Sequence, residues 1–168
     1  PADLEGLTYA GFGSAWEDAL ISTMIENDGG TAEYDTVTLG TGAYEALASG
    51  AVDFTLEVAT WEGVNSMLLG RDQSHFVYAD YGVPEPQGGY IGTRTPTLLN
   101  APHTVDAFME ATARGYAWAA ENPQAAAEIL IEAGNFPNED LVRGSMRVID
   151  EGAYLTDGTA PVGWIDED

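Results

Sequence analysis

Two short segments of the sequence carry side chains that could hold a small ligand. In the first, Glu62 follows the apolar residues 52–56 and stands directly after Trp61. A carboxylate accepts two hydrogen bonds in one plane, and an indole stacks on a flat ring, so this pair suits a planar nitrogenous solute. The alternative is structural: Glu62 as a solvated acid at a helix start, and Trp61 as an aromatic residue of the core.

The second segment is the turn at residues 11–17. Its Ser14 hydroxyl and the free N–H groups of a helix start could bind an anion or a carbonyl oxygen. Ser14 also stands three residues before Glu17, which is the spacing of an ordinary capping box, so both interpretations stay open. The candidate ligand contacts in or near this turn are Phe12, Gly13, Ser14, Trp16 and Tyr44.

The residue types needed for catalysis are scarce. The chain has no Cys and no Lys, which removes thiol chemistry and a Schiff-base lysine from these residues. His75 and His103 lack partners at metal-ligand spacing, and Ser14 has no neighbouring His for a hydrolytic triad. The sequence therefore predicts no catalytic residue, no metal and no cofactor.

The charge is strongly one-sided. Asp and Glu number 28 against 5 Arg, which gives a net charge of −23 and an isoelectric point near 4.1. Such a surface repels phosphate backbones and anionic lipid headgroups, so nucleic acid is not an expected partner. Two explanations remain open: a solvated acidic coat, or selection of a cationic ligand. No apolar run is long enough to span a bilayer.

The first ninety or so residues alternate predicted strands with predicted helices. Apolar or β-branched runs predict four strands at residues 7–10, 36–39, 52–56 and 75–78. Between them, helices are expected at residues 15–27, from Thr41 to Ser49, and up to Leu69. This order predicts right-handed crossovers and a mostly parallel sheet. Ligands of such sheets bind beyond the carboxyl ends of the strands, where both candidate segments would lie.

The pattern changes after Tyr81. A short strand is expected at residues 90–92, followed by a Thr- and Pro-rich connector over residues 93–102. Three helices are then predicted: from His103 or Thr104 to Glu121, from Asn122-Pro123 to Gly134, and from Asn138 to about Gly152. The tail from residue 154 is polar, with one apolar stretch at residues 162–165.

Several segments together resemble the NMT1/THI5-like group of type 2 periplasmic binding proteins. The resemblance rests on residues 3–8 (DLEGLT), 46–53 (ALASGAVD), 61–70 with 81–84 (WEGVNSMLLG, YGVP), 108–116 (FMEATARGY) and 120–123 (AENP), in this order. It implies an α/β fold: a second lobe over residues 1–93, then a crossover and helices of the first lobe over residues 94–168. It also implies an N-terminal half that these residues do not include.

What the resemblance implies about function is capture of a small solute for an ABC importer. Family members include receptors for thiamine pyrimidine precursors, in which a carboxylate at the position of Glu62 faces the ligand's amino group. We therefore expect an aminopyrimidine-like ligand and an ABC permease as partners. The expected location is the periplasmic or extracellular membrane face, through a lipid anchor in a missing N-terminal segment.

Besides a regulatory sensor lobe without a transport role, two other functions stay open at the level of sequence. One is a receptor for a different solute, such as a sulfonate, nitrate or riboflavin; an anion fits less well because the candidate segments carry acids and no base. The other is a pyrimidine synthase of the same fold. The resemblance implies that such enzymes use a lysine-bound pyridoxal phosphate and a Cys-rich motif, and no Cys is present here.

Overall fold

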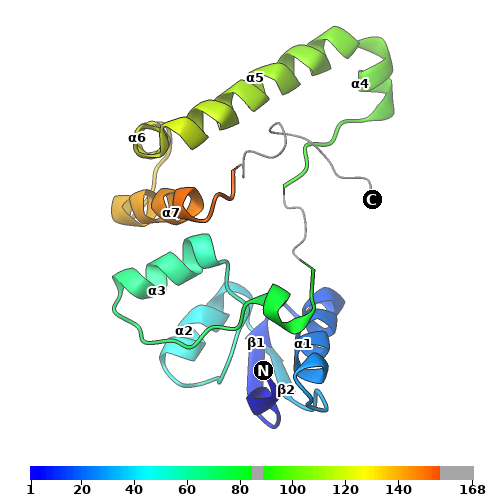
Figure 1. Cartoon of the computed structure of the whole chain (residues 1–168), viewed down its shortest axis with the longest axis vertical. Helices are drawn as coiled ribbons and strands as arrows, with labels where there is room; N and C mark the ends of the chain where they lie inside the picture. Colours follow the sequence, from blue (N-terminus) through cyan, green and yellow to red (C-terminus); the bar gives the residue numbers. More distant parts are fainter. Residues whose placement is uncertain (85–88, 156–168) are drawn as a thin grey trace. The chain divides into compact units, whose positions relative to one another are not determined.

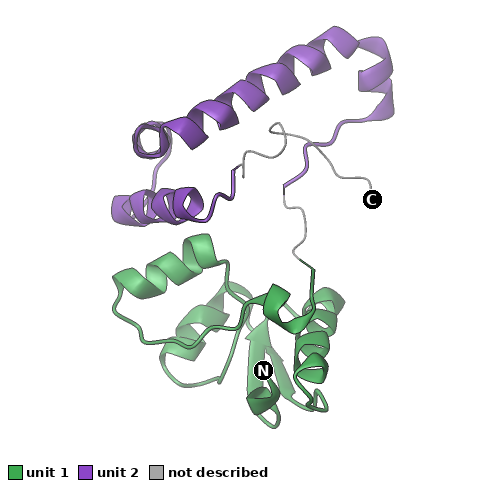
Figure 2. Ribbon diagram, in the orientation of Figure 1, with its two compact units in different colours: residues 1–86 green, residues 87–168 purple. Residues whose placement is uncertain are grey.

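A computed structural model of the chain describes residues 1–84 and 89–155. The chain forms two compact units, Pro1–Pro86 and Gln87–Asp168 (Figures 1 and 2). The first unit mixes strands and helices, and the described part of the second contains helices but no strand. The assignment of residues 1–93 and 94–168 to two lobes of a binding protein stays a prediction.

A small parallel sheet forms the centre of the first unit. Strands β1 (Thr8–Gly11) and β2 (Asp35–Thr38) pair in parallel with Thr8 opposite Asp35, and helix α1 (Ala15–Asn27) connects them (Figure 1). The segment around Phe54 adds to β1 through one parallel bridge with Tyr9. The predicted parallel α/β arrangement is therefore confirmed, on a smaller scale than expected.

Three predicted strands are absent from the described residues. Residues 52–56 form the single bridge at Phe54 rather than a strand, and residues 75–78 and 90–92 form none. The physical reason is pairing, because a β-strand exists only with a hydrogen-bonded neighbour. The backbone of residues 72–76 forms no hydrogen bond within the described part of the chain, and Tyr78–Tyr81 turns instead into a short 3₁₀ helix, η4.

The other helical segments of this unit are short. They are the 3₁₀ helix η1 (Ala2–Leu4), the 3₁₀ helix η2 (Gly40–Gly42), α2 (Ala43–Ala48), the π-helical turn η3 (Ala59–Gly63) and α3 (Val64–Leu68). Thr41 was expected to cap a helix, which is wrong. It lies inside η2, and α2 begins after Gly42 without a side-chain cap.

The core of the first unit lies between α1 and the sheet. Leu20, Ile21, Met24 and Ile25 repeat at helical spacing and are buried, so one face of α1 packs on the strands. Tyr9 of β1 and Phe54 complete this cluster, with their ring centroids 5.3 Å apart. The packing fixes the position of β1 and thereby of the turn that follows it.

Within its described residues, 89–155, the second unit contains four helices. These are α4 (Thr95–Asn100), α5 (Pro102–Glu121), α6 (Pro123–Ala133) and α7 (Glu139–Glu151). Prolines in the first turn begin α5 and α6, and the Asn138 side chain caps α7 as predicted. The predicted connector over residues 93–102 is partly helical, because α4 occupies most of it.

Packing in this unit is concentrated between α6 and α7. Ala126 and Ala127 of α6 contact Val142 and Met146 of α7 in a small buried cluster. None of the residues of α5 is buried. No helix of the described residues is long and apolar enough to cross a membrane. The predicted apolar stretch at residues 162–165 lies outside the described residues.

Candidate functional site

The turn between β1 and α1 is closed by a reciprocal capping box. The Glu17 N–H donates to Ser14 Oγ at 3.2 Å, and the Ser14 N–H donates to Glu17 Oε2 at 2.8 Å. The Ser14 hydroxyl also donates to the same carboxylate oxygen at 2.9 Å. Capping therefore uses both the N–H and the hydroxyl hydrogen of Ser14, so Ser14 as a free donor toward a ligand is not what the structure shows.

Glu17 is the most connected side chain of this turn. It is only 5% exposed, and its Oε1 accepts hydrogen bonds from the Tyr9 hydroxyl at 2.8 Å and the Phe12 N–H at 3.0 Å. Burial by itself would raise the pKa of Glu17. The hydrogen bonds from Phe12, Ser14 and Tyr9 outweigh burial and lower this pKa to about 2. An ionised carboxylate thus joins β1, the turn and α1.

The same arrangement leaves the outer surface of the turn open. Phe12 is 59% exposed and Trp16 is 60% exposed, so both rings are available to solvent. The N–H groups of Ala15 and Trp16, in the first turn of α1, have no acceptor within the described residues. Gly13 adopts a φ of +75°, which lets the chain pass close to Thr38 of β2.

The two carboxylate oxygens of Glu62 differ in their hydrogen bonding. Its Oε2 accepts the N–H of Val58 at 3.1 Å and so closes the π-helical turn η3. Within the described residues no hydrogen bond is recorded to its Oε1. Glu62 is half-buried, and Trp61 beside it is 38% exposed. A carboxylate oxygen therefore stands next to a partly open indole.

Tyr44 lies in the first turn of α2 and is half-buried. Burial is the main cause that raises the pKa of its phenol, followed by the negative charges of Glu62, Glu57 and Glu17. Its neighbour Ala43 packs against Ala10 of β1, so α2 lies beside the strand that precedes the residue 11–17 turn.

Two functional candidates escaped prediction from the sequence. Glu17 was expected only as a capping residue, and its bonds to Tyr9 and Phe12 depend on β1 lying beside α1. Glu57 belongs to no recognisable sequence motif. Its Oε2 is buried without a hydrogen-bond partner within the described residues, and its Oε1 accepts a hydrogen bond from Gln73 Nε2 at 3.5 Å. Asp53 has a structural role, because it accepts the Thr8 N–H at 2.8 Å.

No group of His, Asp or Glu in the described residues could hold a metal ion. His75 lies in the extended segment before η4 and His103 at the start of α5, in different units. The geometry around Tyr44 offers hydrogen-bond acceptors and aromatic faces rather than a nucleophile with a neighbouring base. Chemically, this arrangement can bind a flat, donor-bearing solute.

Comparison with protein families assigns the fold to a class. The family model described as "NMT1/THI5 like" matches residues 1–126, which is most of the chain. The chain belongs to this family, whose members have the periplasmic-binding-protein fold and suit a solute-binding role.

A curated relative points in the same direction. A formylaminopyrimidine-binding protein from Halalkalibacterium halodurans is 32% identical to this chain. The alignment covers 82% of this chain and 43% of the relative, so the chain spans less than half the length of the relative it matches.

Proposed function

We propose that this chain is the ligand-contacting part of a solute receptor that captures an aminopyrimidine-like compound. The proposal rests on two neighbouring residues of η3, Glu62 and Trp61. One carboxylate oxygen of Glu62 has no hydrogen bond within the described residues, and the ring of Trp61 is partly exposed. The relative's binding of formylaminopyrimidine supports the same class of ligand.

The chemistry of the pair selects for N–H donors on a flat ring. The exocyclic amino group of an aminopyrimidine donates to Glu62 Oε1 in a charge-assisted hydrogen bond. Its ring stacks on Trp61, and the exposed rings of Phe12 and Trp16 in the residue 11–17 turn offer further aromatic surface. An anionic solute would meet the negative charge of Glu62, which disfavours sulfonate and nitrate.

In this proposal the receptor delivers its solute to an ABC permease and works at the periplasmic or extracellular face of the membrane. The binding activity in the relative's name supports a receptor rather than a pyrimidine synthase. The absence of Cys from the chain agrees with this choice.

Isothermal titration of the chain with four solutes tests the proposed ligand. Formylaminopyrimidine and hydroxymethylpyrimidine should bind and quench tryptophan fluorescence, because the ring lies on Trp61. Taurine and nitrate should not bind. Binding of an anion alone, or of none of the four, would refute the proposal.

A further inference from the structure

The carboxylate of Glu17 fills a place that is built like an anion-binding site. Two backbone N–H groups, those of Phe12 and Ser14, donate to it at 3.0 and 2.8 Å. Two hydroxyls, those of Tyr9 and Ser14, donate to it at 2.8 and 2.9 Å. Donors that converge in this way at a helix N-terminus are common partners of a bound phosphate, sulfate or carboxylate. Here the chain supplies the anion itself.

This place lies where a solute could reach it. The turn over residues 11–17 follows the carboxyl end of β1, and ligands of parallel sheets bind beyond the carboxyl ends of the strands. Glu17 itself is only 5% exposed, but two of the residues that donate to it, Phe12 and Ser14, are exposed. The donors are therefore close to solvent, although the carboxylate that they bind is buried.

Gly11, at the end of β1, leaves the space that the carboxylate occupies. Its backbone is not left-handed, so the φ angle does not require glycine at this position. A Cβ at Gly11 would lie 2.6 Å from Glu17 Oε1 and would also overlap the Tyr9 hydroxyl. Glycine is thus needed here for room alone, and the room that it leaves is filled by a carboxylate from α1.

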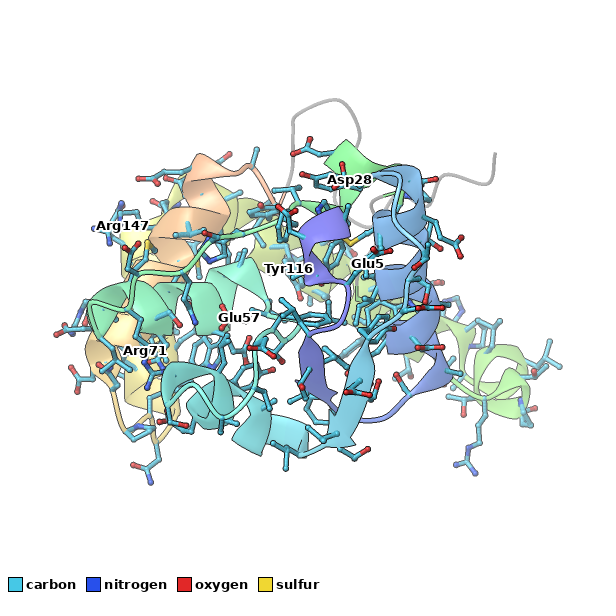
Figure 3. The ribbon with its side chains drawn as sticks, turned by 90° about the horizontal axis from the view of Figure 1, so that it is seen from below. Glu5, Asp28, Glu57, Arg71, Tyr116 and Arg147 are labelled. Atoms are coloured by element: carbon cyan, nitrogen blue, oxygen red, sulfur yellow. The ribbon has the colours of Figure 1, made fainter. Side chains whose placement is uncertain are left out.

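No basic side chain shares this carboxylate among the described residues, because none of the recorded ion pairs includes Glu17. Residues 1–84 contain one Arg and no Lys, and this Arg71, labelled in Figure 3, pairs with Glu45 at 2.8 Å. Although burial raises it, the donated hydrogen bonds hold the pKa of Glu17 at about 2, so the charge is present at neutral pH. A second anion would need the same donors and would be repelled by Glu17 at contact distance.

We propose that Glu17 is a specificity-determining residue that makes the receptor reject anions. Its carboxylate occupies the donors of the residue 11–17 turn, so nitrate, sulfonate and carboxylate solutes find these donors taken and meet a like charge. Neutral and cationic solutes are not affected. Without Glu17 the same turn is an anion site. The inference rests on the proposed function, because it states which solutes the same receptor excludes.

Rescue of Glu17→Ala by acetate tests the proposal, because this substitution removes a methylene and a carboxylate, which together have the shape of one acetate ion. Acetate at about 0.1 M should raise the melting temperature of the variant by about 5 °C or more above its value in NaCl of equal ionic strength. The comparison with NaCl removes the effect of screening in a chain of net charge −23. Glu26→Ala, which removes an exposed acid from the same helix, is the matched control and should melt equally in the two salts.

Glu17→Gln separates the charge from the shape and decides the question if Glu17→Ala does not fold. Its amide still fills the place, so acetate should not stabilise it, but the repelling charge is gone. The N–H groups of Ala15 and Trp16, which have no acceptor within the described residues, then face no negative neighbour in the turn. Nitrate should therefore shift the NMR signals of these two amides in Glu17→Gln and leave them unchanged in the unaltered chain.

The inference and the proposed function can fail separately. The inference is overturned if acetate and chloride act equally on folded Glu17→Ala, if nitrate leaves the amides of Glu17→Gln unchanged, or if the unaltered chain binds nitrate at residues 12–17. Failure of the unaltered chain to bind formylaminopyrimidine refutes the proposed ligand instead, and rescue of Glu17→Ala by acetate would still identify Glu17 as the internal anion of this turn.

Discussion

At the scale of single residues, the site depends on carboxylates that do different work. Both carboxylate oxygens of the buried Glu17 accept hydrogen bonds from the protein. In Glu62 one oxygen accepts the Val58 N–H, and the other has no hydrogen bond within the described residues. The difference follows from position. Glu17 lies on the face of α1 that covers β1, and Glu62 lies in a short turn at the surface.

Glu62→Gln should weaken ligand binding without unfolding the protein. The Gln oxygen can still accept the Val58 N–H, but an amide NH₂ replaces the free oxygen and faces the ligand's donor. Losing a charge-assisted hydrogen bond costs about 1.5–3 kcal/mol, which is roughly a tenfold to hundredfold loss of affinity for formylaminopyrimidine. Calorimetric titration and thermal melting of the same sample measure both quantities.

Glu26→Gln is the control for this change, because Glu26 is an exposed acid of α1 and the substitution removes the same charge. It should leave affinity unchanged. Equal affinity in the Glu62→Gln and unaltered proteins would return Glu62 to the role of a solvated helix-start acid. A large drop in the melting temperature of Glu62→Gln would mark it as structural.

Glu17→Gln should destabilise the first unit and flatten its response to acid. The folded-state pKa of Glu17, about 2, is below its ordinary value of 4.5, so its contribution to stability is present above pH 4.5 and is lost as the pH falls toward 2. At neutral pH the variant should lose about 1.5–3 kcal/mol of unfolding free energy, since an amide cannot accept all of these hydrogen bonds.

Urea unfolding at several pH values between 7 and 2 measures this effect. Many other acids titrate in the same range, so the informative quantity is the difference between the two proteins, which should shrink as the pH falls. A difference that stays constant down to pH 2 would show that the charge of Glu17 is not what stabilises the turn.

At the scale of elements, the turn after β1 requires glycine at residue 13. Gly13 has a φ of +75°, and a Cβ there would lie 2.6 Å from Thr38 Oγ1 on β2. Gly50 has nearly the same φ, +73°, and nothing lies within 4 Å of its would-be Cβ. The two positions thus share backbone strain but differ in crowding.

Gly13→Ala should therefore cost more stability than Gly50→Ala. The left-handed conformation costs about 1–2 kcal/mol in each variant, and crowding against Thr38 adds about 1–3 kcal/mol at residue 13 alone. Chemical denaturation of the two variants gives the comparison. Equal losses would mean that Thr38 moves aside freely and that only the φ angle demands glycine.

At the scale of the whole molecule, acidic charge dominates. Arg71, Arg114 and Arg143 pair with acids; Arg143 alone contacts Glu128, Glu139 and Asp140. These pairs leave most of the 28 acids without a basic partner, because the chain contains only 5 bases. Mutual repulsion of the remaining carboxylates opposes the folded state.

The melting temperature should consequently rise with salt. Between about 0.01 and 1 M NaCl the Debye length falls from roughly 30 to 3 Å, which screens the repulsion. KCl should act equally, because screening depends on ionic strength and not on the identity of the cation. A flat or falling curve would show that repulsion is unimportant, and a rise with one salt only would indicate a specific ion site.

The sequence by itself determined the features that depend on neighbours in the chain. The bounds of α1, the Ser14–Glu17 capping box and the Asn138 cap all follow from residues a few positions apart. The acidic charge follows from composition, and the α/β class follows from the order of apolar runs. The family follows from motifs spread along the chain.

Tertiary structure decided whatever depends on partners distant in the sequence. Residues 75–78 have strand composition, yet they form no strand because no neighbouring edge pairs with them. Glu17 became a buried ion only because Tyr9, eight residues earlier, donates to it across the packed face of α1. Tyr44 lies beside β1 only because folding packs its neighbour Ala43 against Ala10. Local pattern cannot encode these contacts, since each depends on which segments the core brings side by side.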